Sequence, residues 1–509
     1  MTQLVGHTRQ PRGLAAAGLD REILVVGAVV VLGTIMAILD VTIVNVAVPT
    51  LGTEFGASIS TIHWVLTGYL LAFASVIPLS GWATERFGAQ RVWLASLLLF
   101  MLGSALSGAA WSAGSLIGFR AVQGLGGGMI LPVGQTILAQ AAGPQRMGRV
   151  MSVIGVPLLL GPIFGPVVGG AILGAASWRW VFFINLPVGV LAVFAAHRLL
   201  PEAKPQRRQR LDLRGLALLS PGIALVLYGL SDAANRGGFG NTSSVVAGAL
   251  GLALIVSFVA HARARGNEAL IDVSLFLRRG FATAAGVNLL LGIALFGSLI
   301  LLPLYYQVVR GESALATGLL LAPQGAGAAV AMPLAGWLTD KIGARVVVSA
   351  GMLLAMLGTL AYTQVGADTS YVFLAGALFV VGVGIGSTIM PSMAAAFGTL
   401  SRDAVPRATS AINVVQRIAG AVGTALLAVV LQRSVIAGRP DLDGGLQGLA
   451  SLSQGQRAEA APVLAGAFGR TFWVAVALIA AALVPALLLP RLRRDHADVS
   501  GQSGERKAA

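Results

Sequence analysis

The sequence contains GWATERFGAQRVWLASLLLFMLGSAL at Gly81–Leu106 and, 255 residues later, GWLTDKIGARVVVSAGMLLAMLGTL at Gly336–Leu360. Both copies open on a short charged segment and run into an apolar one. A second pair follows in the same order, GLGGGMILP at Gly124–Pro132 and GVGIGSTIMP at Gly382–Pro391. The chain is therefore predicted to consist of two similar halves, a plan on which many alternating-access transporters are built.

The composition indicates that most of the chain lies in lipid. Of its 509 residues, 56% are hydrophobic and only 11% are charged, and the mean hydropathy is +0.83. Soluble domains carry about 25% charged residues. The 66 glycines fit this setting, because small residues let lipid-embedded helices pack closely. The absence of cysteine excludes disulfides and thiolate metal sites.

The apolar segments are long enough to span a bilayer, which takes about 20 residues. The polar N-terminus is followed by an apolar run too long for a signal-peptide core, so we interpret that run as a retained first span. An even number of spans puts both termini on one side. Fourteen spans are predicted, near residues 23–49, 61–82, 92–111, 115–141, 148–174, 180–200, 213–231, 244–262, 281–308, 315–338, 345–365, 371–397, 408–432 and 471–490.

The basic residues predict the orientation. With the N-terminus inside, the inner segments hold 26 of the 35 Lys and Arg, and the outer loops hold seven. This asymmetry predicts cytoplasmic termini in a multi-pass protein of the cell inner (cytoplasmic) membrane. The net charge of +15 comes from short clusters between apolar runs, which indicates a lipid bilayer rather than a nucleic acid as the partner.

The repeat and the spans together predict an all-α polytopic membrane protein with five parts. We expect a cytoplasmic N-terminus (1–22), an N-terminal six-helix bundle (23–200), a linker region with two extra transmembrane helices (201–280), a C-terminal six-helix bundle (281–490) with an outer loop at 433–470, and a cytoplasmic tail (491–509).

Six motifs in order resemble those of the major facilitator superfamily, in particular its fourteen-span drug:proton antiporter group, which includes multidrug and antibiotic exporters. The resemblance covers nearly the whole chain. It implies two six-helix bundles of the major facilitator type plus two extra central spans. The motifs are LDVTIVNVAVP (39–49), GWATERFGAQR (81–91), FRAVQGLGGG (119–128), GPIFGPVVGG (161–170), WRWVFFINLPVG (178–189) and LPLYYQVVRGESALATGLLLAP (302–323).

Asp40 is the acidic residue that the sequence puts well inside a span, about 25 Å along the first helix. Low dielectric favours the neutral acid, and an intramembrane carboxylate is by default functional. We therefore expect Asp40 to carry the coupling proton. Arg120, in the fourth span, would modulate this acid or bind a substrate anion. The alternatives are a structural Asp40 permanently paired with Arg120 or capped by neighbouring donors, and an Arg120 that reaches the interface.

Polar and aromatic side chains are candidates for a central substrate cavity. Asn413, Gln416 and Arg417 share one face of the thirteenth span, although such a face can also hold helices together. The aromatic candidates would otherwise be interfacial anchors. The predicted cavity residues are Trp64, Tyr69, Gln123, Tyr305, Gln307, Asn413, Gln416 and Arg417.

The repeated charged segments are candidates for a cytoplasmic gate. Glu85–Arg86 with Gly88, and Asp340–Lys341 in the second copy, form short charged turns whose contacts could latch one conformation. The motif in the related family usually has Asp where this chain has Glu85. The alternative is that these charges are simply solvated.

The fifth span contains a stripe of small residues. Gly161, Gly165 and Gly169 lie four residues apart, which allows close backbone contact, while Pro162 and Pro166 remove amide donors and bend the helix. We expect this helix to seal the rocking bundles; ordinary small-residue packing is the alternative.

The resulting hypothesis is a proton-coupled antiporter that exports hydrophobic, often cationic drugs or antibiotics by alternating access, without a cofactor. No phosphate-binding loop is present, so an ion gradient must supply the energy. A lipid or a secreted metabolite is the alternative cargo on the same fold. An intramembrane enzyme is disfavoured, because the chain lacks cysteine and its five His lie at span ends or in loops. A non-transporting receptor would tolerate Asp40→Asn. No accessory subunit is identified.

Overall fold

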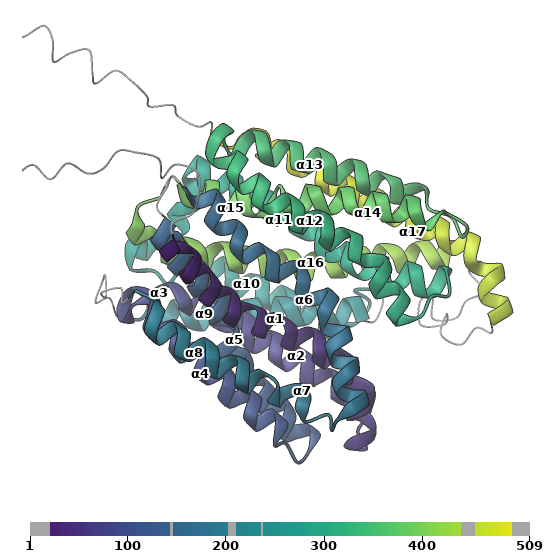
Figure 1. Cartoon of the computed structure of the whole chain (residues 1–509), viewed down its shortest axis with the longest axis horizontal. Coiled ribbons are helices and arrows are strands. Elements are labelled where there is room, and N and C mark those ends of the chain that lie inside the picture. Colours follow the sequence, from purple (N-terminus) through teal and green to yellow (C-terminus); the bar gives the residue numbers. More distant parts are fainter. Residues whose placement is uncertain are drawn as a thin grey trace, which may run out of the picture.

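The computed structural model describes residues 21–142, 146–201, 210–235, 238–398, 400–438 and 454–490. The predicted N-terminal segment up to residue 20, the tail from 491 and the middle of the outer loop lie outside these residues. The described part is helical throughout and holds no strand, which confirms the all-α class. Figure 1 shows helices of the first half and helices of the second half on opposite sides of the molecule.

The first half contains eight α-helices among the described residues. The break between α2 and α3 bends the chain by 53°. The helices are α1 (Arg21–Glu54), α2 (Ile59–Val76), α3 (Leu79–Phe87), α4 (Ala89–Gly108), α5 (Ala113–Ala142), α6 (Met147–Ala175), α7 (Trp180–Phe183) and α8 (Asn185–Leu199).

The second half repeats this order after a central pair of helices. The central pair is α9 (Leu213–Asn235) and α10 (Thr242–Arg265). The second half contains α11 (Arg279–Leu304), which continues into a π-helical turn η4 (Tyr305–Val309), then α12 (Ala314–Ile342), α13 (Ala344–Ala361), α14 (Tyr371–Gly386), α15 (Ile389–Gly398), α16 (Val405–Gly438) and α17 (Gln454–Leu487). Short 3₁₀ turns are η2 (Gly266–Glu268), η3 (Val273–Leu277), η5 (Tyr362–Gln364) and η6 (Arg402–Ala404).

Twelve helical segments of the described chain are long and apolar enough to cross a bilayer, or thirteen when α2 and α3 count as one span. The chain is thus a multi-pass membrane protein. Each predicted apolar segment coincides with a helix, and the segment at 148–174 corresponds to the 29-residue helix α6. Within the predicted outer loop at 433–470, the described residues are helical, since α16 runs to Gly438 and α17 begins at Gln454.

The two halves pack in the same way, as the repeat predicts. A Cβ added to Gly103 on α4 would lie 2.5 Å from the backbone of Gln123 on α5. Its counterpart Gly358 on α13 would meet the backbone nitrogen of Val381 on α14 at 2.8 Å. Glycine at these positions therefore lets each pair of helices approach to backbone contact.

The repeat also preserves two backbone turns. Gly88 links α3 to α4 with φ 88° and ψ 146°, and Gly343 links α12 to α13 with φ 92° and ψ 149°. Residues with a Cβ rarely adopt positive φ values of this kind. Both turns therefore require glycine.

We expect Gly88→Ala and Gly343→Ala each to destabilise the fold by about 1–3 kcal/mol, because alanine is strained at these dihedral angles. Thermal unfolding of the purified protein measures the effect. Gly118→Ala, on an exposed position of α5 with open space around it, is the matched control and should be neutral. Equal melting temperatures for all three variants would contradict the expectation.

The central pair is held together by Asp212 and packs against both halves. Asp212 caps α9 by accepting a hydrogen bond from the Gly215 amide (3.0 Å), and it also contacts His261 Nε2 on α10 (2.9 Å). Burial alone would raise the pKa of Asp212, but hydrogen bonds from Gly215, His261 and Leu270 outweigh burial and lower this pKa below its usual value. Helix α9 packs against α2 of the first half and α16 of the second, so it covers the seam between them.

Candidate functional site

Asp40 and Arg120 form a fully buried ion pair. Asp40 lies in the middle of α1 and Arg120 near the start of α5, and the Arg120 Nη1 to Asp40 Oδ2 distance is 2.6 Å. Both side chains have 0% exposure. The carboxylate therefore faces neither lipid nor water in this conformation, and its charge is balanced inside the first half.

Two amide side chains complete the pairing. Gln123 Nε2 donates to Asp40 Oδ1 (2.9 Å), while Gln123 Oε1 accepts from Arg120 Nη1 (2.7 Å). Asn185, at the start of α8, donates to Asp40 Oδ1 (2.9 Å) and to Ser104 Oγ (3.0 Å). Three helices besides α1 thus supply hydrogen-bond partners to this cluster, which matches the alternative of a paired and capped acid.

Tyr69 of α2 lies beneath the arginine. The Arg120 guanidinium is 4.0 Å from the centre of the Tyr69 ring, and Arg120 Nε donates to the Val65 carbonyl (3.4 Å). Within the described residues, the Tyr69 hydroxyl and Arg120 Nη2 have no hydrogen-bond partner although both are buried. Buried polar groups without a hydrogen-bond partner are costly, so the Tyr69 hydroxyl and Arg120 Nη2 are suited to bind a new partner.

The cluster can respond to a proton. A proton on Asp40 would remove the counter-charge of Arg120 and leave a buried cation uncompensated, which is strongly unfavourable. The surrounding helices must then rearrange or admit a counter-ion or water. Protonation of Asp40 would therefore change how Arg120 is satisfied.

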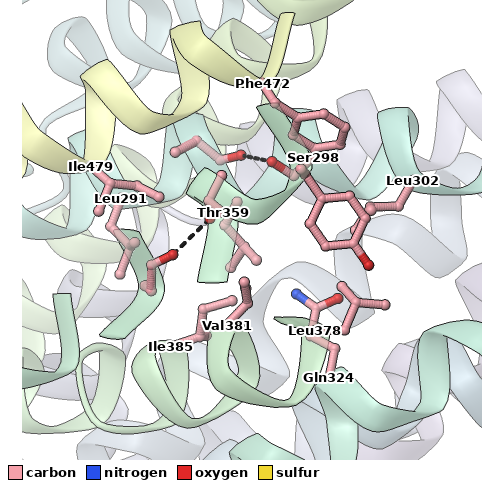
Figure 2. A pocket seen from close by; sticks show the side chains of 14 residues that line it. Leu291, Ser298, Leu302, Gln324, Thr359, Leu378, Val381, Ile385, Phe472 and Ile479 are labelled. Carbon is pink, nitrogen blue, oxygen red and sulfur yellow. Dashed lines mark hydrogen bonds between the residues drawn. The ribbon is translucent and has the colours of Figure 1, made fainter. Parts of the chain in front are cut away.

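The second half has an apolar cavity at the related place (Figure 2). The repeat relates Ser104 to Thr359, Arg120 to Leu378 and Gln123 to Val381, and these three counterparts line the cavity. Its volume is about 20 Å³, enough for about one water. The lining of this cavity thus has a hydroxyl or an apolar side chain where the first half has Ser104, Arg120 and Gln123. Other lining residues are Ser298, Gln324, Tyr362 and Phe472.

Five of the predicted cavity residues lie between helices in the interior. Tyr69 and Gln123 belong to the ion-pair cluster. Asn413 Nδ2 donates to Gln135 Oε1 on α5 (2.7 Å), Gln416 Nε2 donates to Asn288 Oδ1 on α11 (3.1 Å), and the Arg417 guanidinium lies 4.3 Å from the Phe73 ring centre.

Three other predicted cavity residues lie elsewhere. Tyr305 is fully buried in η4, where its hydroxyl donates to the Gly366 carbonyl (2.7 Å), so it packs within the second half. Gln307 is exposed. Trp64 is 43% exposed and stacks on Tyr228 of α9 at 5.9 Å. The π-helical turn and the central pair explain these positions, which local sequence patterns do not reveal.

Two related ion pairs join the halves where the charged motifs lie. Glu85 on α3 binds Arg407 at the start of α16, with Arg407 Nε 2.8 Å from Glu85 Oε1. Asp340 on α12 binds Arg149 at the start of α6, with Arg149 Nε 2.8 Å from Asp340 Oδ2. The first pair is nearly buried, with side-chain exposures of 7% and 4%, and the second is more accessible.

The remaining gate candidates have other surroundings. Arg86 is half-buried in the last turn of α3. Lys341 Nζ lies 3.8 Å from the Trp337 ring centre, a cation–π contact within α12. Gly88 supplies the turn described above.

The small-residue stripe of α6 packs on α1. A Cβ at Gly165 would lie 2.0 Å from Thr42 Oγ1, and one at Gly169 would lie 3.3 Å from the Ile43 carbonyl oxygen. The helix backbones are therefore in close contact, as the spacing predicts. Gly161, Pro162 and Pro166 lie in α6, but their surroundings fall outside the described side chains.

Four site residues were not predicted from the sequence. Ser104 and Asn185 each have only a short polar side chain inside an apolar segment, so no periodicity reveals them. Arg149 and Arg407 carried a usable signal, because both are basic residues at the starts of repeat-related helices, 258 residues apart.

Comparisons with known proteins agree with the architecture. The family profile described as Major Facilitator Superfamily matches residues 30–424. The multidrug resistance protein B homolog of Mycobacterium tuberculosis is 40% identical over 497 residues, covering 94% of this chain and 92% of the relative. The multidrug export protein EmrB of Haemophilus influenzae is 31% identical over 398 residues, covering 78% of each chain.

Solved structures show the same fold at low sequence identity. The human organic anion transporter MFSD10 superposes with a TM-score of 0.58 at 17% identity, covering 91% of this chain and 100% of the other. The proton:xylose symporter XylE has a TM-score of 0.56 at 15% identity, covering 92% of this chain and 96% of the other. These likenesses concern the fold alone.

Proposed function

This chain belongs to the major facilitator superfamily, whose members carry small molecules across membranes, and we propose that it exports hydrophobic drugs or antibiotics in exchange for protons by alternating access. The observation that carries the proposal is the buried Asp40–Arg120 pair. A titratable acid at this depth, held by an arginine and two amides, is suited to alternate between a charged and a neutral state. The multidrug exporters among its relatives support the drug class.

The proposed cycle uses the two ion pairs between the halves as cytoplasmic latches. In the present conformation Glu85–Arg407 and Asp340–Arg149 hold α3 to α16 and α6 to α12. Rocking to the inward-open state must break both pairs. A change in the protonation of Asp40 alters the packing of the first half and would bias this equilibrium.

We also propose the full membrane topology. Adding α6 to the bent pair and the other candidate spans gives fourteen, with both termini cytoplasmic as the distribution of Lys and Arg indicates. In this arrangement residues 23–200 and 281–490 form the two moving bundles, and residues 201–280 form the linker with two extra spans.

The pairing of Asp40 bears on the charge of the substrate. A preference for cationic drugs requires Asp40 to present its negative charge to the substrate, but this carboxylate is paired with Arg120. Within the present conformation it cannot attract a cation. The proposal therefore specifies a hydrophobic substrate, and a preference for cations would require a state in which Asp40 is released.

Reconstitution of the full chain into proteoliposomes tests the proposal. An imposed pH gradient should drive a hydrophobic fluorescent dye against its own concentration gradient, and dye addition should move protons the opposite way. Dissipating the gradient with an ionophore should abolish uphill transport. Dye movement that is the same with and without a pH gradient would contradict proton coupling.

A further inference from the structure

A polar stripe on α16 faces the first half. Its members are Arg407, Ser410, Asn413 and Arg417, which recur every three or four residues along one side of the helix. Arg407 forms the ion pair with α3, Ser410 donates to the backbone carbonyl of Ile77 between α2 and α3 (2.9 Å), and Asn413 binds a side chain of α5. The stripe is thus part of the interface between the halves.

Arg417 is the deepest member of this stripe. It lies ten residues beyond Arg407, about 15 Å further along the helix and so near the middle of the bilayer. Its guanidinium rests on the Phe73 ring of α2 at 4.3 Å. No hydrogen bond or ion pair joins it to the residues that the structure describes. A cation at this depth without a counter-charge is costly, so we expect a functional partner.

Tyr69 provides a second unsatisfied group near Arg417. It lies one helical turn before Phe73 on α2, and its ring centre is 5.8 Å from the centre of the Phe73 ring, the same ring on which the Arg417 guanidinium rests. The Tyr69 hydroxyl is fully buried and lacks a hydrogen-bond partner among the described residues. A donor and a cation therefore both lie against Phe73, and neither has a hydrogen-bond acceptor among the described residues.

The charges around this point leave an excess of positive charge. Asp40 and Arg120 neutralise each other, whereas Arg417 adds one uncompensated charge. Helix α9 covers the seam between α2 and α16, so acyl chains do not reach this position from that side. An anion bound between the halves would balance this charge.

We propose that Arg417 and the Tyr69 hydroxyl bind an acidic group of the exported substrate, so that the preferred substrates are hydrophobic carboxylic acids or similar oxyanions. This inference rests on the proposed export function. The planar guanidinium can donate two parallel hydrogen bonds to a carboxylate, and the hydroxyl can donate a third. The Phe73 ring offers an apolar wall for the remainder of the molecule.

Tyr69 also connects this site to the proton switch. Its ring lies beneath Arg120, which is held in place by Asp40. Protonation of Asp40 removes that restraint, so the hydroxyl loses its fixed position beside Arg417. Protonation also leaves Arg120 with an uncompensated positive charge, which would strengthen the binding of an anion. Protonation of Asp40 can therefore release an anionic substrate only if the loss of the Tyr69 hydroxyl contact weakens binding by more than this charge strengthens it.

Binding to the purified full chain tests the site with three probes that share one ring system: 1-naphthoic acid, 1-naphthamide and 1-naphthylmethylamine. Calorimetric titration of the wild type should show the acid binding at least about ten-fold more tightly than the amide or the amine, as a charge-assisted hydrogen bond allows. Arg417→Gln should reduce acid affinity to that of the amide. Arg417→Lys should retain part of the preference, and Tyr69→Phe should lose a smaller part.

Arg433→Gln is the matched control, because it removes the same charge from an exposed position of the same helix. It should leave the preference for the acid unchanged. Should Arg417→Gln fail to fold by thermal melting, the wild-type preference together with Arg417→Lys and Tyr69→Phe decides the question. The proposal is overturned if the wild type binds the acid no better than the amide, if none of the probes binds, or if a folded Arg417→Gln retains the acid preference.

Proton movement separates this proposal from the export function. Probe-driven proton movement in proteoliposomes that requires Asp40 but shows no preference for the acid would overturn the anion site and leave proton-coupled export intact. A clear acid preference without proton movement for any probe would support the anion site and contradict the proton coupling.

Discussion

Asp40→Asn is expected to abolish drug-driven proton movement in proteoliposomes while the protein still inserts into the membrane. Asparagine cannot carry the proton, so the switch loses its two states. It also leaves Arg120 buried without its counter-charge, which should destabilise the protein by about 3–5 kcal/mol. A pH-sensitive dye measures the proton movement, and thermal melting measures the loss of stability.

A double variant distinguishes a coupling role from a structural one. Combining Asp40→Asn with Arg120→Gln removes both buried charges, so the melting temperature should recover most of its loss. Transport coupling should remain absent, because no titratable group is restored. Recovery of both stability and proton movement in the double variant would show that the pair is only structural.

Breaking the buried latch is the second large effect that we expect. Glu85→Gln leaves Arg407 without its carboxylate in a nearly buried position, at a cost of about 3 kcal/mol or more. Such a change shifts a conformational equilibrium by more than about 100-fold. The cytoplasmic ends should separate. Because the chain has no cysteine, spin labels at Phe87→Cys and Ile342→Cys, two exposed and repeat-related positions, report the distance between them.

The reversed pair provides the control for the latch. Glu85→Arg combined with Arg407→Glu should restore the short distance in part, whereas either change alone should not. Asp403→Asn removes a similar charge from an exposed position near the start of α16 and should leave the distance distribution unchanged. A long distance in the wild type would contradict the assignment of these pairs as latches.

The spans were predictable because lipid imposes a simple requirement. A backbone in hydrocarbon must satisfy its own hydrogen bonds, so every sufficiently long apolar segment is helical. Helix ends beyond the bilayer follow different rules. Residues 454–470 looked like loop by hydropathy, yet this alanine-rich segment continues into α17 because alanine favours a helix with or without lipid.

The site was predictable only in part. A lone carboxylate in an apolar run identified Asp40, and the fourth-span motif identified Arg120. Asn185, which donates a hydrogen bond to Asp40, lies on a different helix and 145 residues after Asp40 in the sequence. Such a contact depends on how helices pack, and no local pattern contains that information. Tyr305 shows the reverse, since its aromatic motif suggested a cavity while the π-helical turn directs it into the packed second half.

The attachment of α9 constrains how the molecule can move. Ser220 of α9 hydrogen-bonds to the Ser75 carbonyl (2.5 Å) and Tyr228 stacks on Trp64, so α9 is anchored to α2 by specific contacts. Helix α9 also packs against α16. If the halves rotate as proposed, we expect α9 to move with the first half and to slide along α16. Helix α9 would then continue to cover the interface between α2 and α16 and keep acyl chains out of it.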